Sequence, residues 1–259
     1  MSDMNRSTKE RAAVRLSKRL KLVASFVPEN ARIADIGTDH GFVPIYLAET
    51  GRIRSALAMD VREGPLGRAK EHVEEYYRAC RGRGSGEEPC SPVHIETRLS
   101  DGLKKLSPGE ADTVIIAGMG GELMIRILEE GCHMWDSVES WILSPQSALD
   151  KVRIFLAQNG FSIADEAMIK EDGKFYTVMR VSRGNMEYAN QAQYLYGKIL
   201  IEKRDAVLGE YLEREKKRLD NILVSFEGKQ GQATGSQEKA IKALTEELSW
   251  VKEAQHEMQ

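Results

Sequence analysis

Acidic residues and glycines follow short apolar segments in the first half of the chain, an arrangement suited to binding a nucleoside cofactor. Residues 34–41 read Ala-Asp-Ile-Gly-Thr-Asp-His-Gly, and Asp60 ends the next apolar segment. Glycine lets a backbone turn sharply and approach a ligand closely. An acid after the second strand of such a unit accepts hydrogen bonds from ribose hydroxyls. We therefore expect Asp35 and Gly37 to form the first loop of a cofactor site, with Asp60 on the ribose.

The spacing within this loop separates two classes of cofactor. A dinucleotide fingerprint places glycines where a pyrophosphate meets a helix N-terminus, whereas here Asp39 stands in the place of the middle glycine. A carboxylate at that position repels a pyrophosphate but tolerates a sulfonium ion with an amino-acid tail. The loop thus favours S-adenosylmethionine over NAD, although Asp39 could also simply cap the helix expected near Phe42.

Two further loops carry residues of the same kind. Asp101 and Gly102 follow the third apolar segment, where they would flank an adenine ring, and residues 118–121 read Gly-Met-Gly-Gly after the fourth. Three glycines in four positions indicate a close backbone approach or a positive φ angle. In a methyltransferase this loop presents the methyl group to its acceptor. The expected cofactor-binding residues are Asp35, Gly37, Asp60, Asp101, Gly102, Gly118 and Gly120.

The absence of two known motifs from these loops restricts the possible methyl acceptors. The fourth loop has no Asp/Asn-Pro-Pro-aromatic motif for exocyclic amino groups and no cysteine nucleophile for pyrimidine carbons. A ring nitrogen such as adenine N1 attacks through its own lone pair, so the enzyme needs alignment more than a strong base. Asp39 or His40 could take a proton from the cationic product, although His40 could equally bond to backbone. We count both with Met119 as candidate catalytic residues.

Composition sets broader bounds. Of 259 residues, 30% are charged and 41% are apolar, and no apolar run reaches the roughly 20 residues of a membrane span. A net charge of −3 argues against a uniformly basic nucleic-acid binder but permits a local basic patch. No secretory signal is evident, and Cys80, Cys90 and Cys132 show no metal-binding spacing. We expect a cytoplasmic protein without a metal or a membrane partner.

Apolar and helical patterns alternate along the first two thirds of the chain. A basic amphipathic helix is expected over 6–26, where Lys18 and Arg19 could contact RNA. Strands are then expected at 32–36, 55–60, 93–99, 113–117 and 140–143, with helices at 43–50, 65–79, 121–130 and 147–158. This alternation predicts a doubly wound parallel α/β sheet.

The remaining segments add a reversed hairpin and a helical arm. Strands at 162–169 and 175–181 flank an Asp-Gly turn, which gives the seven-stranded, Rossmann-like sheet of class I methyltransferases by analogy. Two long helices, 187–226 and 236–258, should pair antiparallel around the loop 228–235 as a coiled-coil-like hairpin. We expect a catalytic domain over 1–184 and an arm over 185–259 that either grips substrate or serves packing. The Gly-rich segment 81–89 is expected to be a surface insertion.

Several motifs together resemble one known family. Residues 15–20 (Arg-Leu-Ser-Lys-Arg-Leu), 34–41, 64–65, 98–102, 117–121 and 171–176 (Glu-Asp-Gly-Lys-Phe-Tyr) occur in the order found in TrmK, the bacterial tRNA (adenine-22-N1)-methyltransferase family. The resemblance covers nearly the whole chain. It implies methylation of N1 of adenosine 22 in the D-arm of tRNA by S-adenosylmethionine, with the C-terminal hairpin and Lys18 and Arg19 on the RNA.

One departure from the family pattern falls near the expected acceptor pocket. After the fifth strand the family usually shows Gln-Pro-Asn, whereas this chain reads Ser144-Pro145-Gln146. Gln146 is therefore the fourth candidate catalytic residue, expected to contact the acceptor base. This change keeps open a methyltransferase of the same fold acting on another RNA or on a small molecule. A non-catalytic S-adenosylmethionine-binding protein is the alternative from another class, and an NAD-dependent oxidoreductase ranks last.

Overall fold

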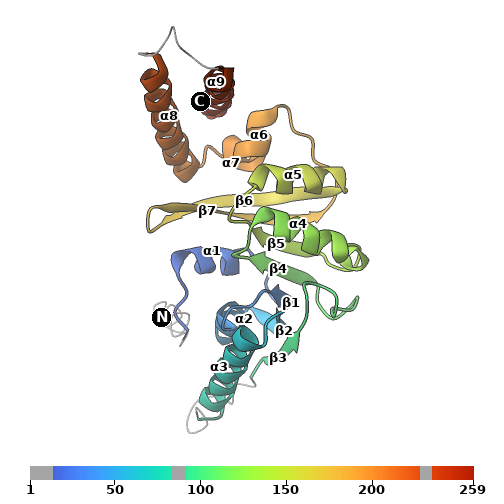
Figure 1. Cartoon of the computed structure of the whole chain (residues 1–259). Helices are drawn as coiled ribbons and strands as arrows, with labels where there is room; N and C mark the ends of the chain where they lie inside the picture. Colours follow the sequence, from blue (N-terminus) through green and yellow to red (C-terminus); the bar gives the residue numbers. More distant parts are fainter. Residues whose placement is uncertain (1–13, 83–91, 228–234) are drawn as a thin grey trace, which may run out of the picture.

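Seven strands form one mixed sheet at the centre of the molecule (Figure 1). The computed structural model describes residues 14–82, 92–227 and 235–259. Within them the strand order is β3-β2-β1-β4-β5-β7-β6, and β7 runs in the direction opposite to that of the other six strands. The strands are β1 Ala31–Ile36, β2 Ile53–Asp60, β3 His94–Leu99, β4 Thr113–Ala117, β5 Ser140–Ser144, β6 Phe161–Glu171 and β7 Lys174–Arg183. The doubly wound sheet and its terminal hairpin are as expected from the sequence.

Helices cover both faces of this sheet. One face packs against α1, α2 and α3, and the other packs against α4 and α5. Neighbouring residues of a strand therefore enter opposite cores: Ile115 packs with the first group and Ile116 with the second. The helices are α1 Lys18–Phe26, α2 Phe42–Glu49, α3 Glu63–Gly82, α4 Gly121–Glu130, η1 Cys132–Met134 and α5 Leu149–Gln158.

The first helix is shorter than the sequence pattern suggested. We expected it over 6–26, but α1 begins at Lys18, and residues 14–17 are not helical. Ser17 ends the preceding extended segment and accepts a hydrogen bond from the Leu20 amide at 3.3 Å, which is a typical helix N-cap. The remaining part of that prediction, residues 6–13, lies outside the described residues.

The expected helix over 187–226 is also wrong as a single element. The structure divides it into α6 Gln191–Tyr196, α7 Lys198–Glu202 and α8 Ala206–Glu227. Gly197 breaks it first, with φ at 95°, and Arg204 breaks it again, with φ at 52°. Asp205 then caps α8 by accepting hydrogen bonds from Val207 and Leu208, both at 2.9 Å. The apolar stripe continues through these breaks because α7 and α8 pack into one cluster.

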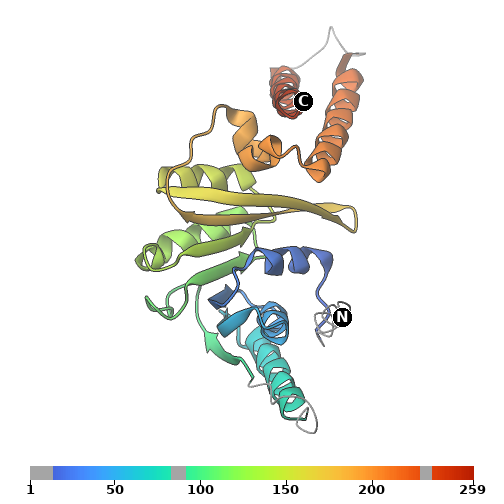
Figure 2. The ribbon, with the colours of Figure 1, turned by 180° about the vertical axis from the view of Figure 1, so that it is seen from behind.

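The last helix, α9 Gly235–Glu257, lies antiparallel to α8. Arg218 contacts Glu247 at 2.6 Å and Gln255 contacts Glu213 at 2.5 Å, so positions rise on one helix as they fall on the other. The pair stands at the β6 end of the sheet, opposite to α3 and β3 (Figures 1 and 2). The expected loop at 228–235 lies outside the described residues except for Gly235. The antiparallel helical hairpin is thus confirmed.

A buried ion pair joins this C-terminal part to the sheet. Arg153 of α5 and Glu166 of β6 are fully buried and lie 2.9 Å apart. The same guanidinium donates to the carbonyl oxygens of Tyr194 and Leu195 at the end of α6. Gly197 follows directly, and a Cβ atom there would lie 2.7 Å from Glu166 Oε2. This contact explains why the chain needs glycine where α6 ends.

Among the described helices, none combines the length and the apolar character required to cross a membrane.

Candidate functional site

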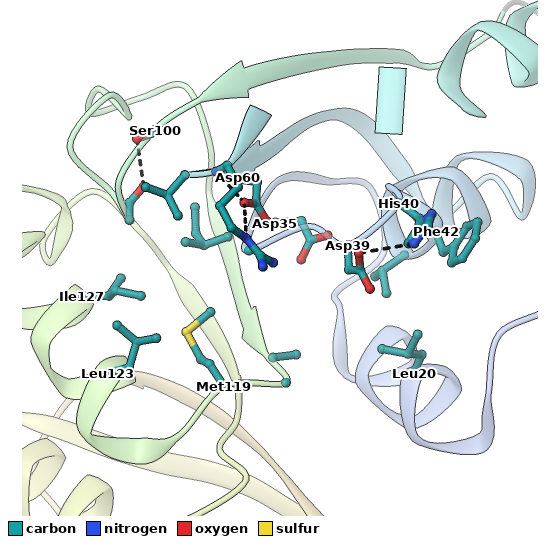
Figure 3. A pocket seen from close by; sticks show the side chains of 18 of the residues that line it. Leu20, Asp35, Asp39, His40, Phe42, Asp60, Ser100, Met119, Leu123 and Ile127 are labelled. Atoms are coloured by element: carbon teal, nitrogen blue, oxygen red, sulfur yellow. Dashed lines mark hydrogen bonds and ion pairs between the residues drawn. The ribbon is translucent and has the colours of Figure 1, made fainter. Parts of the chain in front are cut away.

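A cavity of about 780 Å³ opens at the carboxyl edge of the sheet, between the loops that follow β1, β2, β3 and β4. Parallel strands end on the same edge, so the residues that follow each strand meet there. Figure 3 shows Asp35 and Asp60 at the centre, with Asp39 and His40 on one side and Met119, Leu123 and Ile127 on the other. The predicted residues in the lining are Asp35, Gly37, Asp39, His40, Asp60, Asp101, Gly102, Gly118 and Met119.

Asp35 and Asp60 are the two buried acids of this cavity, with 7% and 5% of their surface exposed. Asp60 accepts a hydrogen bond from the Arg62 amide at 2.8 Å, which fixes its carboxylate at the end of β2. Burial raises the pKa of Asp35 to about 6, and repulsion from Asp60 adds to the rise. At neutral pH the pair offers negative charge to a ligand in a poorly solvated place.

The loop after β1 is tightly curled. Gly37, His40 and Gly41 all have φ between 64° and 76°. The amides of Gly37 and Thr38 both donate to the Met59 carbonyl, at 2.8 and 2.9 Å, which ties the loop to β2. A Cβ atom on Gly37 would lie 2.8 Å from the Met119 Cε atom across the cavity. Gly37 therefore allows the loop both its conformation and its close approach to Met119.

Asp39 and His40 differ in exposure and in side-chain packing. Asp39 is 70% exposed at its side chain, and its Oδ1 atom lies 3.4 Å from His40 Nε2. It does not cap the next helix, because Gly41 is the N-cap residue of α2 and no side chain bonds there. The His40 ring stacks on Phe42 and on His72, and the His40 carbonyl lies 2.9 Å from His72 Nδ1. Packing holds the histidine, whereas Asp39 is open to the cavity.

The loop after β3 lines the cavity with charged side chains, and helix α4 lines it mainly with apolar ones. Asp101 binds Lys104 at 2.5 Å, and this hydrogen bond lowers the pKa of the Asp101 carboxyl group. Opposite to it, Leu123 and Ile127 line the cavity from successive turns of α4. Leu123 and Val61 are among the few exposed large apolar side chains of the described chain. Such a wall suits the faces of a nucleobase.

The glycine-rich loop after β4 serves several purposes. Gly118 lines the cavity and has φ at 84°. Gly120 does not line the cavity, and its φ of −65° is open to any residue. At Gly121 a Cβ atom would lie 2.4 Å from the Ser147 carbonyl oxygen, so this glycine lets α4 pack against the loop after β5. We expected Gly120 to bind the cofactor, but it lies next to Met119, outside the lining of the cavity.

Gln146 also lies outside the cavity. Its amide donates to the Met119 carbonyl at 2.9 Å, which places it directly behind the glycine-rich loop. Its side chain is exposed and lines a separate hollow of about 380 Å³, together with Gly173, Lys174, Phe175, Tyr176, Tyr211 and Arg214. Two contacts join the linings of the two hollows: Gln146 bonds to Met119, and Arg19 lies over the Tyr176 ring.

Lys18 and Arg19, both expected on RNA, point to different places. Lys18 is exposed and takes no part in the cavity lining, whereas Arg19 lines the cavity beside Gly118. Further residues of the lining were not predicted from the sequence: Ser17, Leu20, Ile36, Phe42, Val43, Val61, Arg62, Ser100, Ala117, Leu123, Arg126 and Ile127. The spacing of Leu123 and Ile127 after the glycine-rich loop was the one available signal.

Comparisons with known proteins agree with this geometry. Residues 16–179 match the family model described as a methyltransferase domain. The tRNA (adenine(22)-N(1))-methyltransferase of Bacillus subtilis (strain 168) is 32% identical over 245 residues, which cover 93% of this chain and 97% of that protein.

Solved structures give the same result. The crystal structure of the B. subtilis m1A22 tRNA methyltransferase TrmK has 30% identity and a TM-score of 0.76, covering 93% of this chain and 99% of that one. A proposed tRNA (m1A22) methyltransferase of Streptococcus pneumoniae, solved in complex with S-adenosyl-L-methionine, has 33% identity and a TM-score of 0.76 over the same shares. The Rossmann-like methyltransferase fold expected from the sequence is thereby confirmed.

Proposed function

Because the chain belongs to the tRNA (adenine-22-N1)-methyltransferase family, we propose that it transfers a methyl group from S-adenosylmethionine to N1 of adenosine 22 in the D-arm of tRNA. The observation that carries this proposal is the meeting of a buried acid at the end of β2 with a glycine-rich loop after β4 in one cavity. Both features follow from where parallel strands end.

The residues of the cavity fit S-adenosylmethionine. Asp60 would hold the ribose hydroxyls, while Val61, Leu123 and Ile127 would enclose the adenine beside Asp101 and Gly102. Asp35 and Asp39 would face the positive charges of the amino-acid tail and the sulfonium group. These carboxylates would repel the pyrophosphate of a dinucleotide, which is why we place NAD last.

The bound cofactor would supply an electrophilic methyl group. The residues of the cavity would position the acceptor and exclude water from the site. Met119 and the backbone of Gly118 would hold the acceptor ring near the methyl group, with N1 attacking through its lone pair. The positive charge then rests on the adenine. Asp39, open to the cavity and near His40, would stabilise this charge and could accept a proton from the ring's amino group. His40 would keep the loop in place by stacking.

The RNA would lie across the second hollow and the helical arm. Gln146 stands there next to Lys174 and Arg214, with Phe175, Tyr176 and Tyr211 supplying aromatic surface. Cations bind phosphates, and aromatic rings accept unstacked bases. The target base must leave its stack to reach Met119, so contacts near Gln146 would hold its neighbours.

The proposal assigns different roles to the two parts of the chain. Residues 1–184 would bind the cofactor and carry out the methyl transfer, and residues 185–259 would grip the tRNA. The antiparallel packing of α8 on α9 and the anchoring of α6 through Arg153 support a firm arm. A cytoplasmic location follows from the proposed tRNA substrate.

Incubation with unmodified total tRNA and methyl-labelled S-adenosylmethionine tests the proposal. Nucleoside analysis should find the label in 1-methyladenosine, and the Asp60→Ala variant should give none. Label in another nucleoside would mean a different acceptor and would draw attention to Gln146. Cofactor binding without any label in RNA would contradict the proposed activity and favour a small-molecule acceptor or a non-catalytic role.

A further inference from the structure

We propose that a second nucleotide of the tRNA, close to the target adenosine, places its base in a separate inner hollow between β7 and α8 (Figure 1). This inference rests on the proposed methylation of tRNA and deepens it, because it assigns a further base-binding site to the RNA. The inner hollow has a volume of about 190 Å³. Its walls come from the loop after β5 and from α5, β6, β7, α6 and α8.

Three aromatic rings line the inner hollow. The ring centroid of Tyr211 lies 5.2 Å from that of Phe175 and 6.4 Å from that of Tyr196. Arg153 also lines the hollow, but Glu166 lies 2.9 Å away and neutralises its charge. Aromatic walls bind the faces of unstacked bases, whereas a phosphate needs a cation. The hollow therefore suits the base of a nucleotide better than its phosphate.

Two hydroxyl groups of the inner hollow lack a hydrogen-bond partner. Thr177 is 2% exposed and Tyr196 is 8% exposed, and neither hydroxyl makes a hydrogen bond within the described residues. Both residues line the hollow, and neither hydroxyl is among the polar atoms that the protein covers completely without a partner. Buried polar groups normally have partners, and a hydroxyl both donates and accepts. The polar edge of a base would satisfy these groups.

The inner hollow adjoins the second hollow, since Gln146, Phe175 and Tyr211 line both. Lys174 lines the second hollow, is exposed and forms no ion pair within the described part of the chain. A nucleotide with its base between the rings would bring its phosphate to this lysine. Because the Gln146 amide bonds to the Met119 carbonyl at 2.9 Å, the nucleotide would lie beside the loop that receives the target base.

A third hollow determines from which side the base enters. This hollow, of about 430 Å³, shares Tyr196 and Tyr211 with the inner hollow. Its described lining contains no lysine or arginine but three acids, Asp150, Glu246 and Glu247. Carboxylates repel the phosphates of an RNA strand, so the strand would not continue in this direction. The base therefore enters from the second hollow, and its phosphate stays on the cationic side.

The Thr177→Val variant tests this assignment, because it removes the hydroxyl and keeps the branched shape. In titrations with S-adenosylhomocysteine present, it should bind an unmodified tRNA transcript about threefold to tenfold more weakly, as expected for one neutral hydrogen bond. Affinity for S-adenosylhomocysteine should not change, and the fold should lose no stability, because the hydroxyl has no partner within the described protein. Thr113→Val is the matched control. Thr113 is also 2% exposed on a strand, but its hydroxyl bonds to Asp112 at 3.1 Å, so this variant should lose stability and keep its affinity for tRNA.

Transcripts that each lack one base of the D-arm identify the bound nucleotide. Removal of the base that occupies the inner hollow should abolish the difference in affinity between Thr177→Val and the unmodified protein. Unchanged tRNA affinity in Thr177→Val, or a difference that persists with every transcript, would overturn the assignment. A difference abolished only at position 22 would overturn it too, because the hollow would then hold the target base. Since affinity is measured without methyl transfer, a protein that binds these transcripts but forms no 1-methyladenosine would contradict the proposed function and leave this comparison intact.

Discussion

The carboxyl group of Asp35 is buried beside that of Asp60, at the ends of adjacent parallel strands (Figure 3). Burial raises the pKa of Asp35 to about 6, and the charge of Asp60 contributes to the rise. Two buried acids held side by side cost stability, and such a pair in a cavity is typical of a binding site. A cation in the cavity would favour the ionised form of Asp35.

Affinity for S-adenosylmethionine should therefore depend on pH. Above a pH of about 6 Asp35 is ionised and attracts the cationic tail, whereas below it the acid is neutral. We expect the dissociation constant to rise by up to about tenfold per pH unit below that value. Titrations between pH 5 and pH 8 measure the dependence. Asp35→Asn should bind weakly at every pH, and a flat profile in the unmodified protein would contradict the account.

The same pKa predicts that Asp35 lowers the stability of the unliganded fold at neutral pH. Its folded pKa is above the unfolded value of 3.8, so the folded state loses stability as pH rises from about 4 to about 6 and stays at the lower level above it. The shift corresponds to about 3 kcal/mol. Asp35→Asn should raise the free energy of unfolding by an amount approaching this at pH 8 and by clearly less at pH 5. Urea denaturation at the two pH values decides the matter; an equal gain at both would disprove the pKa argument.

Gly37→Ala should weaken cofactor binding by several-fold, because the added Cβ atom displaces the end of the Met119 side chain within the cavity. Gly37 has φ at 76°, and an added Cβ atom would lie 2.8 Å from Met119 Cε. Gly51→Ala is a matched control, because its φ is 68° but nothing lies within 4 Å of the added atom. Both variants should lose about 1 kcal/mol of stability from backbone strain. Only Gly37→Ala should also lose affinity, and equal affinity in the two variants would exclude the proposed close approach.

Replacing Arg153 should release the C-terminal arm from the sheet. Arg153→Leu leaves Glu166 buried without its partner, which typically costs 3–5 kcal/mol in such pairs. The exposed pair of Lys151 and Glu122 provides the control, since solvent screens it and Lys151→Ala should leave the free energy of unfolding nearly unchanged. Chemical denaturation compares the two. A loss below 1 kcal/mol in Arg153→Leu would mean that other contacts hold the arm.

The sequence predicted the sheet and the loops of the cavity because both depend on local patterns. Short apolar runs alternate with amphipathic helices, and parallel strands then bring the following residues to one edge. Asp35, Asp60 and Asp101 meet for this reason. No contact between distant segments had to be known.

The errors have a common physical origin in contacts between distant segments. The helix expected over 187–226 is broken at Gly197, because the buried pair of Arg153 and Glu166 occupies the space beside it. Arg19 was grouped with Lys18 because both are basic. Its direction depends on Glu171, which is 152 residues away in the sequence. Such a contact cannot be predicted from composition or from the periodicity of apolar residues.

The most direct test of the central claim uses two tRNA transcripts that differ only at position 22. One carries adenosine at that position and the other carries guanosine, and both are incubated with S-adenosylmethionine and the protein. The account predicts 1-methyladenosine at position 22 of the first transcript and no methylation of the second. Equal methylation of both transcripts, or none of the first by a protein that binds the cofactor, would contradict it.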